Sequence, residues 1–166
     1  MDLETKLSGI GLVIKATIHS FMGAFILSTI MNGGYVDLTN YPVDKDELYY
    51  LERIMELENS SGGDRCLLLT GAVVLNRRNS KNWSGDTCKE VLYDKGQYAQ
   101  KTKDNIHKVK VPDRVDMLAR YLLIWGPQKI CPSNVVYQGQ NQYAGSGLYE
   151  SIPVPGSSKP EAFCFE

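Results

Sequence analysis

The sequence predicts an α+β domain that is mainly helical, with a small antiparallel sheet at its C-terminal end. Apolar residues recur at three- and four-residue spacing in segments that extend as far as Trp125. After Gly126 and Pro127 the pattern changes to short runs of β-branched and aromatic residues, separated by Gly, Ser and Pro. Helices first and strands last favour an α+β arrangement, and 166 residues suffice for one domain with an appendage.

We separate a hydrophobic segment, residues 1–35, from the domain at residues 36–166. Residues 10–31 are almost continuously apolar, although Lys15 interrupts them, and counted from Ala16 they fall short of the roughly 20 residues that a spanning helix needs. A membrane anchor, an export signal and an amphipathic helix packed on the domain remain open. Lysines before the run and acidic residues after it favour an anchor or signal, with the domain extracellular or in the cell envelope and possible membrane contact through this run.

A helix is predicted to begin at Asp44, which forms a capping-box-like start with Glu47. Its apolar face contains Leu48, Leu51 and Met55, and Glu58 is the next residue of that series. Glu58 lies in the last turn, where partial burial and the negative end of the helix dipole both raise a carboxyl pKa toward that of a general acid. The alternative is a glutamate that turns back to solvent.

The remaining elements follow from local patterns. Residues 64–77 are apolar almost all round the circumference between Cys66 and Leu75, which predicts a helix enclosed by the domain. Thr87 and Glu90 have the spacing of a capping box and open a short helix, whereas the lysine-rich residues 101–110 predict a solvated surface loop. A last helix is expected from Pro112 to Trp125, and short strands are expected at residues 135–138, 148–149 and 162–165.

Charge and composition exclude several classes of function. Eighteen basic and nineteen acidic residues give a net charge of −1, so no nucleic-acid partner is expected. Two histidines and four well-separated cysteines do not form a zinc pattern, and we expect no metal and no cofactor. Cys66 and Cys88 are predicted core residues. Cys131 and Cys164 could form one disulfide if the domain is exported. A cysteine nucleophile paired with His107 is an alternative that no local signature supports.

Four motifs together resemble the cell wall hydrolase family typified by spore-cortex-lytic enzymes. They match in order and spacing over roughly residues 46–138, with a weaker echo near the C-terminus. The motifs are Arg53-Ile-Met-Glu-Leu-Glu58, Gly71-Ala-Val-Val-Leu-Asn-Arg77, Thr87-Cys-Lys-Glu-Val-Leu-Tyr93 and Gly96-Gln97-Tyr98. The family's aromatic-rich strand differs here, where the chain has Val136-Tyr137-Gln138-Gly139-Gln140.

The resemblance implies a lysozyme-like fold that cleaves the β-1,4 bond between N-acetylmuramic acid and N-acetylglucosamine in peptidoglycan. Members of the family are regarded as lytic transglycosylases, and the alignment places their catalytic glutamate on Glu58. The resemblance also suggests that Gln97 and Tyr98 line the substrate cleft. Tyr137 and Gln138 are further candidates for contact with the glycan strand, from the C-terminal sheet.

The number of carboxylates bears on the reaction. Ordinary glycoside hydrolysis uses two carboxyl groups, whereas a lytic transglycosylase needs one, because the muramic acid C6 hydroxyl is the nucleophile. Glu58 is the one well-placed carboxylate in the sequence, and Asp64 and Asp86 are weaker candidates. This favours a transglycosylase. A muramidase, a wall-binding module without activity and a membrane-anchored scaffold are the alternatives.

Overall fold

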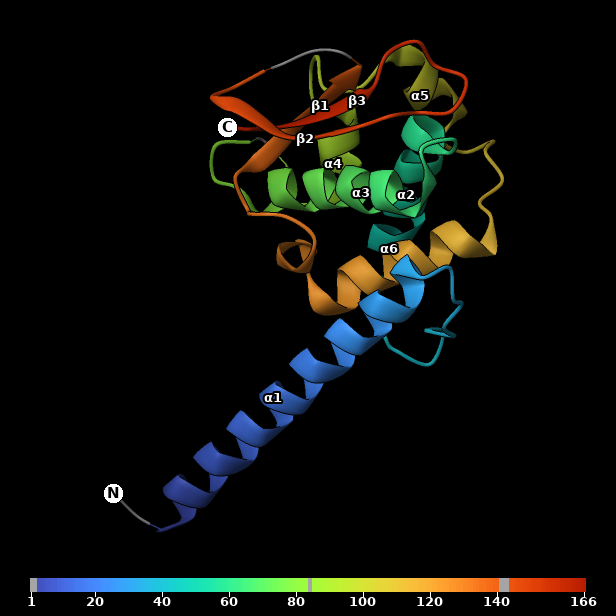
Figure 1. Ribbon diagram of the computed structural model, residues 1–166. Helices are drawn as coiled ribbons and strands as arrows, with labels where there is room; N and C mark the ends of the chain where they lie inside the picture. Colours follow the sequence, from blue (N-terminus) through green and yellow to red (C-terminus); the bar gives the residue numbers. More distant parts are fainter. Residues whose placement is uncertain (1–2, 84, 141–143) are drawn as a thin grey trace. The chain divides into compact units, whose positions relative to one another are not determined.

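The computed structural model describes residues 3–83, 85–140 and 144–166, with side chains from residue 15 onward. The chain divides into two compact units, Met1–Val36 and Asp37–Glu166. The first unit contains helix α1 (Leu3–Met31). The second contains, in order, α2 (Lys45–Asn59), α3 (Gly63–Asn79), α4 (Cys88–Tyr93), α5 (Gln100–Asn105), α6 (Asp113–Trp125), the 3-10 turn η1 (Pro127–Lys129), β1 (Val135–Gln140), β2 (Gly147–Ile152) and β3 (Glu161–Phe165) (Figure 1).

This order confirms the predicted α+β class, with helices first and a small antiparallel sheet last. β3 is the central strand and pairs antiparallel with β1 on one side and β2 on the other. Each pairing contains one irregularity, between Val135 and Tyr137 in β1 and between Leu148 and Glu150 in β2. The last strand of the chain thus lies between the two strands that precede it.

The N-terminal segment is described mainly by its backbone. Among the residues whose side chains are described, no helix is long and apolar enough to cross a membrane. The prediction of a membrane anchor or export signal concerns residues 10–31, and the side chains of residues 10–14 lie outside the described residues. The membrane anchor or export signal therefore stays a prediction.

Helix α3 is the centre of the second unit, as its uniformly apolar sequence predicts. Every residue from Cys66 to Arg77 is buried, and α2, α4, α6 and β1 pack around the helix (Figure 1). Gly71 lets α3 lie close to α2 and α6, because a Cβ atom there would collide with Leu122 of α6 and Met55 of α2. Packing at this density leaves little freedom in the positions of the elements that α3 holds.

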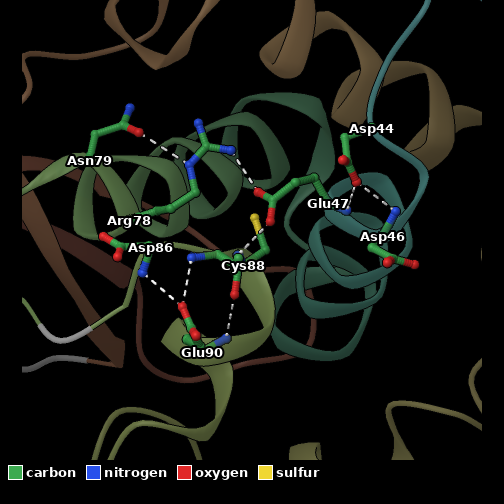
Figure 2. Close-up of polar contacts among 9 residues, drawn as sticks. Asp44, Asp46, Glu47, Arg78, Asn79, Asp86, Cys88 and Glu90 are labelled. Carbon is green, nitrogen blue, oxygen red and sulfur yellow. Dashed lines mark hydrogen bonds and ion pairs between the residues drawn. The ribbon is translucent and has the colours of Figure 1, made fainter.

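The start of α2 is tied to two other helices through Glu47. The Asp44 carboxylate caps α2 by accepting the backbone N–H groups of Asp46 and Glu47 at 2.9 and 3.0 Å. The Glu47 side chain does not complete a capping box. It accepts instead from Arg78 Nη1 at 2.6 Å and from the backbone N–H of Cys88 at 3.0 Å (Figure 2). The predicted box at Thr87 and Glu90 is fully formed.

Replacing Glu47 with glutamine is expected to destabilise the protein by about 1–2 kcal/mol. The change keeps the shape of the side chain but removes the charge that strengthens its bonds to Arg78 and to the start of α4. Urea unfolding followed by circular dichroism measures the loss. Asp46→Asn is the matched control, because it removes the same charge from the first turn of α2 at an exposed position. Equal effects of the two substitutions would contradict a role for the Glu47 contacts.

The structure corrects the prediction of a surface loop at residues 101–110. Gln100–Asn105 form helix α5, and Thr102 in that helix is buried. All six residues of this short helix, QKTKDN, are polar, so that no apolar stripe marks it and its formation depends on packing. The correction matters because Thr102 contacts Glu58.

Candidate active site

A pocket of about 190 Å³ contains three of the residues that the sequence analysis selected. Its lining residues are Glu58, Gln97, Gln138, Gly139, Gln140 and Glu161. They come from the end of α2, the loop between α4 and α5, strand β1 and the first residue of β3. The pocket is therefore formed by segments about 100 residues apart in the chain.

Glu58 is half-buried at the C-terminal end of α2. Its Oε1 atom accepts a hydrogen bond from Thr102 Oγ1 at 2.6 Å. Burial raises the pKa of the Glu58 carboxyl above its ordinary value, while the Thr102 hydrogen bond and the charge of Arg77 act in the opposite direction. The shift is toward the neutral acid relative to an exposed glutamate, which is the direction that a general acid requires.

The end of α2 that carries Glu58 is fixed to α3 by its neighbour. Asn59 is only 4% exposed, and its Nδ2 atom donates to Thr70 Oγ1 at 2.6 Å. The Thr70 hydroxyl in turn donates to the backbone oxygen of Cys66 at 2.9 Å. These bonds lie in the core, where they hold the last turn of α2 in one position.

Two residues of α3 hold the strand that forms the other side of the pocket. Asn76 Nδ2 donates to the backbone oxygens of Pro132 and Val135 at 2.9 and 3.0 Å. Arg77 Nε donates to the backbone oxygen of Val136 at 2.6 Å. These contacts account for both residues as anchors of β1 and thereby of Gln138.

Glu161 is the residue that sequence reasoning missed. It is 5% exposed although its side chain is ionisable, and it lines the pocket together with Glu58. Burial, reinforced by the nearby charge of Glu58, raises the pKa of Glu161 from 4.5 to about 7, against a hydrogen bond from Asn59 that lowers it. The premise of one well-placed carboxylate is therefore wrong, because the pocket contains two.

The predicted substrate contacts divide into two groups. Gln97 and Gln138 line the pocket with Glu58, and the Gln138 Oε1 atom is buried with no hydrogen-bond partner among the described residues. Tyr98 and Tyr137 are not among the lining residues. The Tyr98 ring is buried, 5.6 Å from the Arg77 guanidinium carbon.

Tyr137 is half-buried, and its ring packs edge-on against Trp83, with the two ring centroids 5.6 Å apart. The Arg77 guanidinium carbon lies 4.8 Å from the Trp83 ring. The two tyrosines, Trp83 and Arg77 thus form a packed aromatic layer beside the pocket. In this structure the amides rather than the tyrosines reach the pocket.

Asp64 and Asp86, the two weaker carboxylate candidates, do not line this pocket. Asp64 forms an ion pair with Arg114 between α3 and α6. Asp86 is exposed, and its backbone N–H donates to Glu90 in the capping region of α4. The Asp64 carboxylate thus serves a contact between two helices, and Asp86 takes part in capping through its backbone.

A cysteine nucleophile does not fit the structure. All four cysteines are free and buried, which leaves the alternative Cys131–Cys164 disulfide unformed. Burial raises the pKa of Cys66 to about 12 and that of Cys131 to about 11, so that neither forms a thiolate at neutral pH. His107 Nδ1 lies 2.8 Å from the Tyr49 hydroxyl instead.

The raised pKa of Glu161 has a consequence for stability. A carboxyl whose pKa is higher in the folded than in the unfolded chain binds more protons when folded, so folding becomes less favourable as pH rises through the interval. With values of 4.5 and about 7, we expect the wild-type protein to lose stability relative to Glu161→Gln between about pH 4.5 and about pH 7. Urea unfolding of both proteins at several pH values tests this; a constant difference would contradict it.

Among the described residues, no group of three or more His, Cys, Asp or Glu side chains could hold a metal ion. The pocket offers carboxyl and amide groups only, which suit hydrogen bonding to hydroxyl and acetamido groups. Comparison of the chain with protein-family models, curated proteins and solved structures finds no match.

Proposed function

We propose that the protein cleaves peptidoglycan glycan strands at the β-1,4 bond between N-acetylmuramic acid and N-acetylglucosamine, as a lytic transglycosylase. The single observation that carries the proposal is the half-buried Glu58 carboxyl, which shares a pocket with two glutamine amides. The resemblance to the cell wall hydrolase family, with its lysozyme-like fold, adds the substrate. The extracellular or cell-envelope location and membrane contact through residues 10–31 belong to the same proposal.

In this mechanism Glu58 acts first as an acid and then as a base. Its proton passes to the glycosidic oxygen as the bond from C1 to that oxygen breaks. The C6 hydroxyl of the same muramic acid then attacks C1, and its proton returns to a carboxylate of the site. The attack is intramolecular, so that no water has to be bound and oriented for the step.

Incubation of the full chain with purified peptidoglycan, followed by mass spectrometry of the soluble muropeptides, tests the proposal. Muropeptides with 1,6-anhydro ends are expected from the wild-type protein. Absence of any released muropeptide would reject the enzyme, and intact binding to insoluble wall in that case would favour the wall-binding module.

A muramidase is the second candidate, and Glu161 favours it. With two carboxyl groups in one pocket, the chain has the number that ordinary glycoside hydrolysis uses. Water would then replace the C6 hydroxyl as the nucleophile. Reducing ends in place of anhydro ends among the products would identify this reaction.

Removal of a pocket amide is expected to weaken glycan binding. Gln97→Ala or Gln138→Ala should each raise the Kd for a soluble peptidoglycan oligosaccharide by about 2- to 10-fold, the value of one neutral hydrogen bond. Titration calorimetry in a Glu58→Gln background measures binding without cleavage. Gln128→Ala, an exposed glutamine outside the pocket, is the matched control. Unchanged affinity in both pocket variants would place the cleft elsewhere.

A further inference from the structure

Two glutamates from different parts of the chain line the same small pocket. Glu58 reaches it from the last turn of α2, and Glu161 reaches it from the first residue of β3. Glu161 is 5% exposed and lines the pocket, and the charge of Glu58 lies near enough to raise the pKa of the Glu161 carboxyl. Asn59, the residue next to Glu58, lies near enough to the Glu161 carboxyl to lower its pKa.

Electrostatics limits how many charges this pocket holds. Two carboxylates at one site repel each other, so one of them keeps its proton over an intermediate pH range and the two titrate as a unit. Arg77 from α3 and Thr102 from α5 act on Glu58, and Asn59 from α2 acts on Glu161. The charge of Glu161 in turn contributes to the raised pKa of Cys66, and the charge of Glu58 to that of Tyr98. Arg77 supplies one positive charge, which balances a pair with one negative charge.

We propose that Glu161 is a second catalytic group, and that Glu58 and Glu161 hold one proton between them and act as acid and base in the same cleavage. The inference rests on the proposed function. It assigns the acid and the base to two side chains, whereas the family resemblance provides for Glu58 alone.

In this reaction the pair gives up one proton and takes up one proton. The protonated member gives its proton to the glycosidic oxygen, and the bonding electron pair of the broken bond from C1 goes to that oxygen. A lone pair of the incoming hydroxyl forms the new bond to C1, and the hydroxyl proton goes to the ionised member. The pair again carries one proton, with the two members exchanged.

Carbon-13 NMR of the full chain with labelled glutamate carboxyl groups tests the shared proton without any substrate. In the wild-type protein we expect the two carboxyls to titrate together in two well-separated steps. In Glu58→Gln the remaining Glu161 should titrate in a single step at lower pH than the upper wild-type step, because the neighbouring charge is gone. Glu166→Gln, which removes an exposed carboxyl at the other end of the chain segment that forms β3, should change neither step.

The catalytic role is tested by pH–rate profiles of muropeptide release. The wild-type profile of kcat/KM should be bell-shaped, because only the pair with one proton is active. Glu161→Gln should lower the maximum by about 10²-fold or more and remove one limb of the bell. The double variant Glu58→Gln with Glu161→Gln should be no slower than the slower single variant, since residues that act as a unit are not additive.

The outcomes separate this inference from the proposed function. An active wild-type protein whose Glu161→Gln variant keeps both its rate and its bell-shaped profile would overturn the second catalytic group. A Glu161 titration that Glu58→Gln leaves unchanged would overturn the shared proton. A wild-type protein with the coupled titration but no released muropeptides would instead reject the proposed function. If Glu161→Gln does not fold, Glu161→Asp, with its shorter side chain, should keep the two-step titration and lose rate.

Discussion

Replacement of Glu58 with glutamine is expected to lower the initial rate of muropeptide release by about 10²–10⁴-fold. Glutamine keeps the size of the side chain and can still accept the hydrogen bond from Thr102, but it has no proton to give to the glycosidic oxygen. Mass spectrometry of the muropeptides released over time measures the rate. Binding to insoluble peptidoglycan should be retained, because the other residues of the pocket are unchanged.

Glu56→Gln is the matched control for this experiment. Glu56 lies in the same helix, is also half-buried, and has a pKa that burial likewise raises, but it does not line the pocket. Its substitution should leave the rate within a factor of about two, as for a group outside the chemistry. A Glu58→Gln protein as fast as this control would remove Glu58 from the mechanism.

Local sequence signals predicted the helical part of the fold well. The capping box at Thr87 and Glu90 is formed as its spacing indicates, and Gly126 ends α6 with a φ of 85°. The burial of α3 could be predicted because apolar residues cover almost its whole circumference between Cys66 and Leu75. Each of these signals depends on residues within one or two turns of each other.

The parts that were missed depend on contacts between distant segments. Glu161 reaches the pocket because β3 inserts between β1 and β2, a pairing that no short stretch of sequence specifies. The available hint was a charged residue at the start of the otherwise apolar strand Glu161–Phe165. The Glu47 side chain likewise does not complete the predicted capping box. It accepts hydrogen bonds from Arg78 in α3 and from the backbone N–H of Cys88 in α4.

The assignment of the tyrosines shows the same limit. Tyr98 adjoins Gln97 in the sequence, yet its ring turns into the core beside Arg77 while the glutamine lines the pocket. An aromatic residue in a loop can stack on a sugar or pack against an arginine. Here the arginine comes from α3, and the ring packs beside it. Only the packed structure distinguishes these two environments.

Replacement of Arg77 with methionine is expected to destabilise the protein by about 2–4 kcal/mol. Arg77 is 3% exposed, and its Nε–H is bonded to the backbone oxygen of Val136 at 2.6 Å. Methionine fills much of the same volume but leaves that buried oxygen without its donor, and it removes the cation beside the rings of Trp83 and Tyr98. The Nη1 atom of Arg77 has no partner among the described residues, which reduces the expected loss.

The same substitution should alter the titration of Glu58. The positive charge of Arg77 lowers the pKa of Glu58, so removing it should move the Glu58 transition to higher pH. Carbon-13 NMR of the glutamate carboxyls measures the shift, and urea unfolding measures the stability. Arg120→Met is the matched control, because Arg120 forms an i,i+4 ion pair with Asp116 on α6 that is worth about 0.5 kcal/mol or less. If Arg77→Met costs no more than this control and leaves the Glu58 transition in place, then β1 and the pocket are held by contacts other than Arg77.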